Sequence, residues 1–97
     1  NSFKTAYNTA LGIKGSNRSK ALLIAANCVA KTANSCGSST FERKCNYYYA
    51  AQLAEKAGNP GIASKYRSNA PSADDIFSNN SPATVTLTCW GISVDVK

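Results

Sequence analysis

The 97-residue sequence predicts one mainly α-helical domain that ends in a two-stranded β-hairpin. Apolar residues recur at helical spacing in several segments before residue 78. After Pro82 the apolar period changes from 3.6 to 2, which is the period of a strand. Four cysteines indicate disulfide staples, because a domain of this length buries only a marginal core.

The first helix is expected over residues 1–14, and a turn signal of glycine, serine and asparagine follows it at 15–17. A hairpin of two helices is predicted over residues 19–58. Its first helix is apolar around most of its circumference, so neighbours must cover it on several sides. Ser39 and Glu42 have the spacing of a capping box, which starts the second helix. Gly58 ends that helix, since glycine adopts the left-handed conformation at no steric cost.

Two short helices are predicted over residues 60–78, with Asn59 and Ser72 as their N-caps. A β-hairpin is predicted over residues 83–97. On its first strand Val85, Leu87 and Cys89 share one face, and on its second strand Ile92, Val94 and Val96 do so. Because a two-stranded hairpin is marginal alone, this apolar face is expected to pack on the helices.

Disulfides are favoured over free buried thiols, which stay the alternative, and over a metal site, because the cysteine spacing matches neither a C-x-x-C motif nor zinc spacing and the chain has no histidine. In an antiparallel helix hairpin Cys28 and Cys45 lie level, each about six residues from the connecting loop, which predicts a bridge between them. By elimination Cys36 pairs with Cys89 and clamps the β-hairpin onto the helices. Pairings of Cys36 with Cys28 or Cys45 stay open, since sequence alone does not fix connectivity. Disulfides indicate an exported protein, in the periplasm, on the cell surface or secreted.

Nothing in the sequence points to an enzyme, a cofactor or a metal site. Histidine is absent, and the adjacent acids Asp74 and Asp75 point about 100° apart on a helix, where they complement its dipole. No glycine-rich loop follows a strand. The net charge of +6 is spread along the chain without a basic run, so no nucleic-acid partner is expected. No stretch approaches the roughly 20 apolar residues of a transmembrane helix.

The candidate partner contacts are aromatic: Tyr47, Tyr48, Tyr49 and Trp90. Three consecutive helical positions span about 200°, so at least one tyrosine reaches a second surface. We favour packing of these rings between the helices and the hairpin, with a partner or subunit contact as the alternative.

Small and apolar residues in the central hairpin, among them Ala21, Ala25, Ala50 and Ala54, occupy positions like the signature of a tetratricopeptide repeat. More specific are the segments A-N-S-C-G at 33–37, K-A-G-N at 56–59, N-A-P-S at 69–72, I-F at 76–77 and C-W-G at 89–91. In these segments the chain resembles the C-terminal end of tetratricopeptide-repeat (TPR) proteins of Bacteroidetes bacteria. The resemblance implies a TPR-like α-solenoid fragment, in which residues 1–14 are the second helix of a preceding repeat and residues 83–97 are a cap. It also implies that Cys36 and Cys89 are the family-like cysteines and that Cys28 and Cys45 are an extra pair.

The expected function is therefore non-catalytic protein–protein interaction or assembly, by a C-terminal portion of a larger exported TPR protein. About one and a half repeats do not make a full groove, so an upstream portion or a neighbouring subunit is expected to complete it. Two alternatives stay open. One is a structural subunit of an extracellular or periplasmic assembly, and the other is a small secreted basic effector that binds anionic surfaces.

Overall fold

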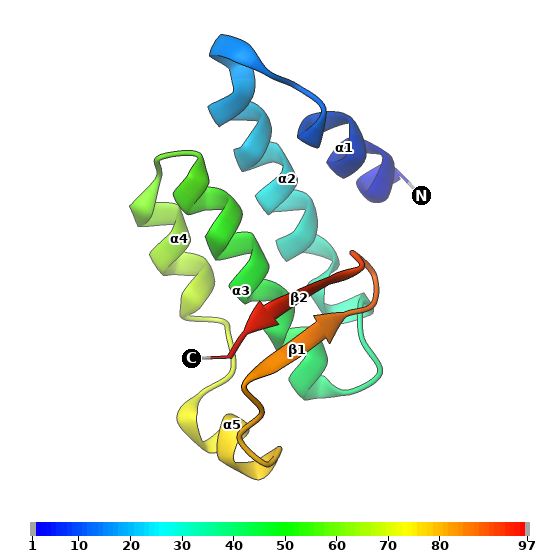
Figure 1. Cartoon of the computed structure of the whole chain (residues 1–97), viewed down its shortest axis with the longest axis vertical. Helices are drawn as coiled ribbons and strands as arrows, with labels where there is room; N and C mark the ends of the chain where they lie inside the picture. The colour runs from blue at the N-terminus through cyan, green and yellow to red at the C-terminus, as the bar shows by residue number, and fades with distance from the viewer. Residues whose placement is uncertain (1, 97) are drawn as a thin grey trace.

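A computed structural model describes residues 2–96, which form a mainly helical chain with a two-stranded antiparallel β-hairpin at its C-terminal end (Figure 1). This confirms the coarse fold predicted from the sequence. Short 3-10 turns lie at Gly15–Asn17 and Ala33–Ser35. The main elements are α1 (Ser2–Leu11), α2 (Arg18–Thr32), α3 (Thr40–Lys56), α4 (Pro60–Arg67), α5 (Ala73–Ser78), β1 (Thr84–Leu87) and β2 (Ile92–Asp95).

The helices α1 to α4 lie side by side, and each packs mainly on its neighbour in the sequence (Figure 1). Thus α2 packs between α1 and α3, while α4 packs on α3. The β-hairpin lies across α3, and both strands contact it. The molecule measures 42 × 28 × 18 Å. Over residues 2–96, no helix combines the length and the hydropathy needed to cross a membrane.

Alanine is the most frequent residue on the buried faces of α2 and α3. Because the distance between two helix axes depends on the side chains at their contact, small residues let the two helices approach closely. The opposite side of α2 carries the exposed residues Lys20, Asn27 and Lys31. The fully buried alanines of the two helices are Ala25, Ala26, Ala50, Ala51 and Ala54.

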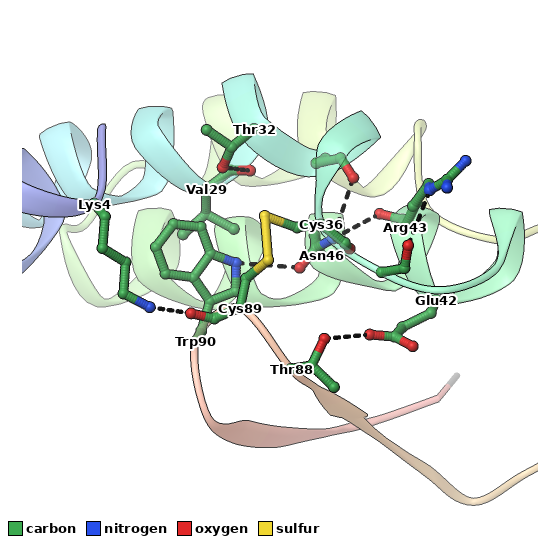
Figure 2. The surroundings of a disulfide bond; sticks show 12 residues. Lys4, Val29, Thr32, Cys36, Glu42, Arg43, Asn46, Thr88, Cys89 and Trp90 are labelled. Carbon is green, nitrogen blue, oxygen red and sulfur yellow. Dashed lines mark hydrogen bonds between the residues drawn. A yellow bond between two sulfur atoms is a disulfide. The ribbon is translucent and has the colours of Figure 1, made fainter. Parts of the chain in front are cut away.

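At the start of α3, one of the two hydrogen bonds of the predicted capping box is formed. Ser39 Oγ accepts a hydrogen bond from the Glu42 N–H at 3.1 Å. The Glu42 carboxylate does not return to Ser39, but accepts from the backbone N–H of Ser38 at 3.4 Å. Its second oxygen accepts from the Thr88 hydroxyl at 3.0 Å, so this carboxylate also connects α3 to the β-hairpin (Figure 2). Partial burial opposes ionisation of Glu42, but the hydrogen bonds from Thr88 and Ser38 outweigh it and lower the pKa of the carboxyl.

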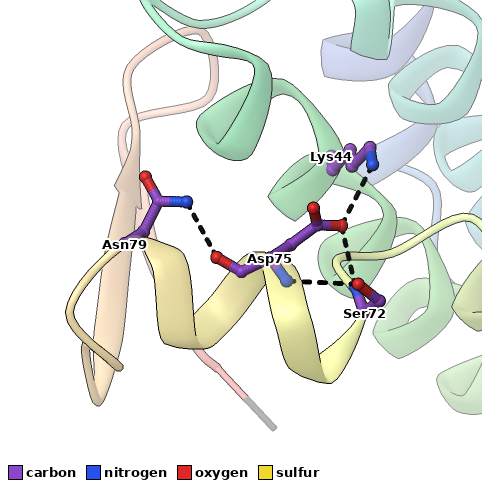
Figure 3. Close-up of polar contacts among 4 residues, drawn as sticks. All are labelled: Lys44, Ser72, Asp75 and Asn79. Atoms are coloured by element: carbon purple, nitrogen blue, oxygen red, sulfur yellow. Dashed lines mark hydrogen bonds and ion pairs between the residues drawn. The ribbon is translucent and has the colours of Figure 1, made fainter.

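The helix α5 begins with a complete capping box and is tied to α3 (Figure 3). The Asp75 N–H donates to Ser72 Oγ at 3.2 Å, and the Ser72 N–H donates to the Asp75 carboxylate at 3.0 Å. The same carboxylate forms an ion pair with Lys44 of α3 at 3.0 Å. The hydrogen bond from the Ser72 N–H, followed by the contact with Lys44, lowers the pKa of the Asp75 carboxyl. Asp75 therefore lies in the first turn of α5, as predicted, and in addition completes the capping box, which the sequence analysis did not predict.

The two strands pair in a register that places Val85 opposite Val94 and Leu87 opposite Ile92. Leu87 and Val94 are buried, which confirms the predicted apolar face. The first strand is shorter than the predicted one. It ends at Leu87, whose carbonyl accepts from the Gly91 N–H at 2.8 Å and so closes a tight turn. Cys89 consequently lies in this turn and not on the strand face where the alternation placed it.

Gly58 ends α3 in the left-handed conformation, with a φ of +78°. Its N–H donates to the Glu55 carbonyl at 2.9 Å, and the Asn59 N–H donates to the Ala54 carbonyl at 3.0 Å. This pair of hydrogen bonds satisfies carbonyls that the helix end would otherwise leave open.

We expect Gly58→Ala to lower the free energy of unfolding by about 1 kcal/mol, because a residue with a Cβ is strained at this φ. The added methyl group would meet no atom within 4 Å, so the cost comes from the backbone alone. Gly61→Ala, inside α4, is the matched control and should raise stability by up to about 1 kcal/mol. Urea unfolding followed by circular dichroism measures both, and equal losses for the two variants would contradict the assignment.

Candidate functional site

A disulfide joins Cys36, in the loop after α2, to Cys89, in the β-hairpin turn (Figure 2). The two Cα atoms are 5.6 Å apart, and the bridge spans a sequence separation of 53. This is the pairing that elimination predicted, and it excludes a bridge from Cys36 to Cys28 or to Cys45. The bond fastens the end of the hairpin to the helical layer.

Cys28 and Cys45 are buried free cysteines, which corrects the prediction of a bridge between them. Equal height in a helix hairpin does not suffice for a disulfide. Helix axes lie about 8–10 Å apart, so only side chains that point directly at each other bring their sulfur atoms into range. Burial raises the pKa of the Cys28 thiol, and burial together with the nearby Glu42 charge raises that of Cys45 to about 11.

The centre of the site is Asn46, which sequence reasoning missed. Its side chain is fully buried on α3. Its Nδ2 group donates to three backbone carbonyls, those of Cys36 at 2.7 Å, Arg43 at 3.0 Å and Ala33 at 3.3 Å. Its Oδ1 atom accepts from the indole N–H of Trp90 at 3.1 Å (Figure 2). One amide thus joins α3, the loop after α2 and the hairpin turn. The available signal was an asparagine on an otherwise apolar helix segment.

The loop after Cys36 lies close against the first turn of α3. Gly37 has a φ of +147°, and a Cβ atom there would lie 3.0 Å from the backbone nitrogen of Arg43. The Arg43 Nε–H donates to the Gly37 carbonyl at 3.1 Å. Only glycine combines this backbone conformation with so close an approach. The half of the disulfide that comes from Cys36 is therefore held by a tightly packed loop.

Trp90 packs against the helices, in line with the favoured interpretation of the sequence. Its ring centroid lies 4.4 Å from that of Tyr7, and the ammonium of Lys4 lies 4.8 Å from its centroid. The same ammonium donates a hydrogen bond to the carbonyl of Cys89. These contacts fasten α1 to two adjacent residues of the hairpin turn, Cys89 and Trp90.

The three tyrosines of α3 divide between two environments. Tyr48 and Tyr49 are buried, and the Tyr49 hydroxyl shares a 2.5 Å hydrogen bond with that of Tyr7. Burial, followed by this hydrogen bond, raises the pKa of Tyr7. Tyr47 is half-buried, and burial of Tyr66 on α4, followed by its electrostatic interaction with Tyr47, raises the pKa of Tyr66. The structure thus brings Tyr49 and Trp90 together around Tyr7 and places Tyr47 on the α4 side.

A pocket of about 350 Å³ opens beside the disulfide. It offers one cation, two hydroxyl groups, the Trp90 side chain and the two bridged cysteines, a set of groups that suits ligand binding. Over residues 2–96, no cluster of three or more histidine, cysteine or acidic side chains could hold a metal ion. The residues that line the pocket are Lys4, Thr32, Ser35, Cys36, Cys89 and Trp90.

Comparison of the chain with protein-family models, curated proteins and solved structures finds no match in any of the three. The resemblance to TPR proteins therefore stays a prediction. Function has to be inferred from the geometry and the charge distribution of the described residues.

We expect Asn46→Ala to lower the free energy of unfolding by about 2 kcal/mol, because it leaves the partly buried Trp90 N–H and the partly buried carbonyl of Cys36 without their partner. Urea unfolding monitored by Trp90 fluorescence measures the loss. Asn27→Ala, at an exposed position of α2, is the matched control and should change stability by less than about 0.5 kcal/mol. Similar small changes for both variants would refute the central role of Asn46.

Thiol counting tests the cysteine assignment. Unfolded but unreduced protein should be alkylated by iodoacetamide at Cys28 and Cys45 only, and reduced protein at all four cysteines. In the native protein at pH 8, Cys45 should react at least about 100-fold more slowly than when unfolded, because its raised pKa keeps it protonated until well above that pH. Peptide mass spectrometry identifies the labelled sites. A lack of free thiols in unfolded, unreduced protein would restore the second bridge.

Proposed function

We propose that this chain is a non-catalytic protein-interaction module, formed by the TPR-like end of a larger exported protein. The packing of each helix on its sequence neighbour supports a solenoid, since repeat proteins are built from contacts between adjacent units. The Cys36–Cys89 disulfide supports an oxidising compartment.

The observation that carries the proposal is an exposed row of residues on α2, which we call the α2 ridge: Lys20, Ile24, Asn27 and Lys31. These positions share one helix face, and the row is about 16 Å long at 1.5 Å per residue. Ile24 is 50% exposed at its middle. A large apolar side chain between two cations is suited to a partner that combines an apolar residue with flanking acids.

The charge distribution supports an acidic partner. The cations are spread along the whole chain, as expected, but the acids are not, because no aspartate or glutamate precedes Glu42. α1 and α2 therefore carry positive charge that no acid on the same helices offsets. Such an unbalanced field speeds association with an acidic surface and selects against basic partners. The cations before Glu42 are Lys4, Lys14, Arg18, Lys20 and Lys31.

One observation favours the structural-subunit alternative. Phe77, on α5, is 80% exposed, and α5 lies at the end of the molecule away from the start of α2 (Figure 1). A second apolar surface at that end would allow copies to associate head to tail. The mass of a cross-linked partner separates the two functions.

A photo-crosslinking residue in place of Ile24 should capture one discrete protein in cells of the natural source, whereas the same residue in place of the exposed Ser64 of α4 should not. Mass spectrometry of the adduct identifies the captured protein and shows whether it is a second copy of this chain. The double charge reversal Lys20→Glu with Lys31→Glu should remove the adduct, because the acidic partner would then be repelled.

The matched control reverses two exposed lysines elsewhere, Lys56→Glu with Lys65→Glu, and should leave the adduct in place. An adduct of twice the chain mass would overturn the proposal in favour of a structural subunit. Equal capture from positions 24 and 64, no capture at all, or an adduct that survives reversal on the α2 ridge would also overturn it.

A further inference from the structure

The pocket beside the disulfide is bounded by three segments that are fixed to one another. Lys4 comes from α1, Thr32 and Ser35 come from the end of α2 and the turn after it, and Trp90 comes from the hairpin turn. The covalent bridge and the Asn46 hydrogen bonds hold the turn after α2 to the hairpin turn, and the contact of Tyr7 with Trp90 holds α1 to the hairpin turn. Binding a ligand would therefore cost little conformational entropy, because the walls of the pocket are already ordered. The volume of about 350 Å³ is at the small end of the range for ligand pockets.

The pocket has an oriented cation with donor capacity left over. The Lys4 ammonium has three N–H groups, of which one donates to the Cys89 carbonyl. Its position over the Trp90 ring fixes where the charge lies (Figure 2). The two ion pairs found over residues 2–96 use Lys44 and Arg67, so the charge of Lys4 has no carboxylate partner there. An anionic group on a ligand could take the remaining donors.

The other walls indicate the rest of the ligand. The half-buried indole of Trp90 offers a flat, polarisable surface and the disulfide offers polarisable sulfur, which together suit an aromatic ring. Thr32 uses its hydroxyl hydrogen on the Cys28 carbonyl at 2.8 Å, so its oxygen presents lone pairs and would not attract an anion. Ser35 is exposed on the same wall and carries a hydroxyl that can donate. The anionic group therefore belongs near Lys4 and Ser35.

We propose that this pocket binds a small aromatic carboxylate, with its carboxylate on Lys4 and Ser35 and its ring against Trp90 and the Cys36–Cys89 bridge. This site is separate from the α2 ridge and does not depend on the proposed function. Trp90 is the only tryptophan of the chain, so its fluorescence reports directly on the wall of the pocket.

Phenylacetate is the probe, titrated into the oxidised full chain while Trp90 fluorescence is followed. We expect saturable binding with a Kd of about 1 mM or tighter. Lys4→Met should weaken binding about 10-fold, and Ser35→Ala about 2-fold, while Lys14→Met removes the same charge at an exposed site and should change the Kd less than 2-fold. The neutral isostere phenylacetamide should bind about 10-fold more weakly than phenylacetate.

Circular dichroism establishes that each variant is folded, and the NMR shifts of the Trp90 indole N–H give a second readout in the unmodified chain. An unsaturated titration at about 10 mM phenylacetate overturns the proposal. Equal weakening by Lys4→Met and Lys14→Met would mean that only overall charge attracts the probe, and equal binding of phenylacetamide would mean that the carboxylate is not recognised. Either result also overturns it.

Discussion

The hydrogen bonds of the buried Asn46 amide are the interaction on which the rest of the structure depends. They join α3 to the loop after α2 and to the turn of the β-hairpin, which are far apart in the sequence. The disulfide connects the same loop and turn covalently. A covalent bond alone would leave these two segments free to rotate about each other, whereas the amide fixes the carbonyl of Cys36 and the indole of Trp90 on one side chain. A buried amide that lacks its hydrogen-bond partners destabilises the folded state. Other placements of the loop and the hairpin turn on α3 are therefore strongly disfavoured.

Because Asn46 fixes the position of Trp90, the contacts of Trp90 with α1 also fix the position of that helix. Tyr7 packs on the indole, and Lys4 contacts both the ring and the carbonyl next to it. α1 is thus held by the hairpin turn as well as by α2. The β-hairpin, too small to be stable alone, gains its stability from these contacts and from the burial of Leu87 and Val94. The pocket between α1, the end of α2 and the turn is a consequence of the same three-way contact.

Rigidity and charge are distributed differently over the molecule. The disulfide and the Asn46 hydrogen bonds stabilise one end of the helical layer, while the acid-free helices α1 and α2 present cations and the exposed Ile24. The buried thiols of Cys28 and Cys45 are held protonated by burial, so they behave as small apolar core residues. The proposed protein-interaction function would use this combination, because it places charged and apolar side chains on a fixed scaffold.

The sequence by itself determined the local structure. The caps at Ser39, Asn59 and Ser72 and the stop at Gly58 depend on residues within one turn, so they could be read directly. The identity of the bridged cysteines, the buried role of Asn46 and the pocket beside Trp90 depended on tertiary structure. Sequence placed Cys28 and Cys45 at equal height, but a disulfide also requires that two side chains point at each other. That direction is set by how each helix is rotated against all its neighbours, which no local pattern encodes.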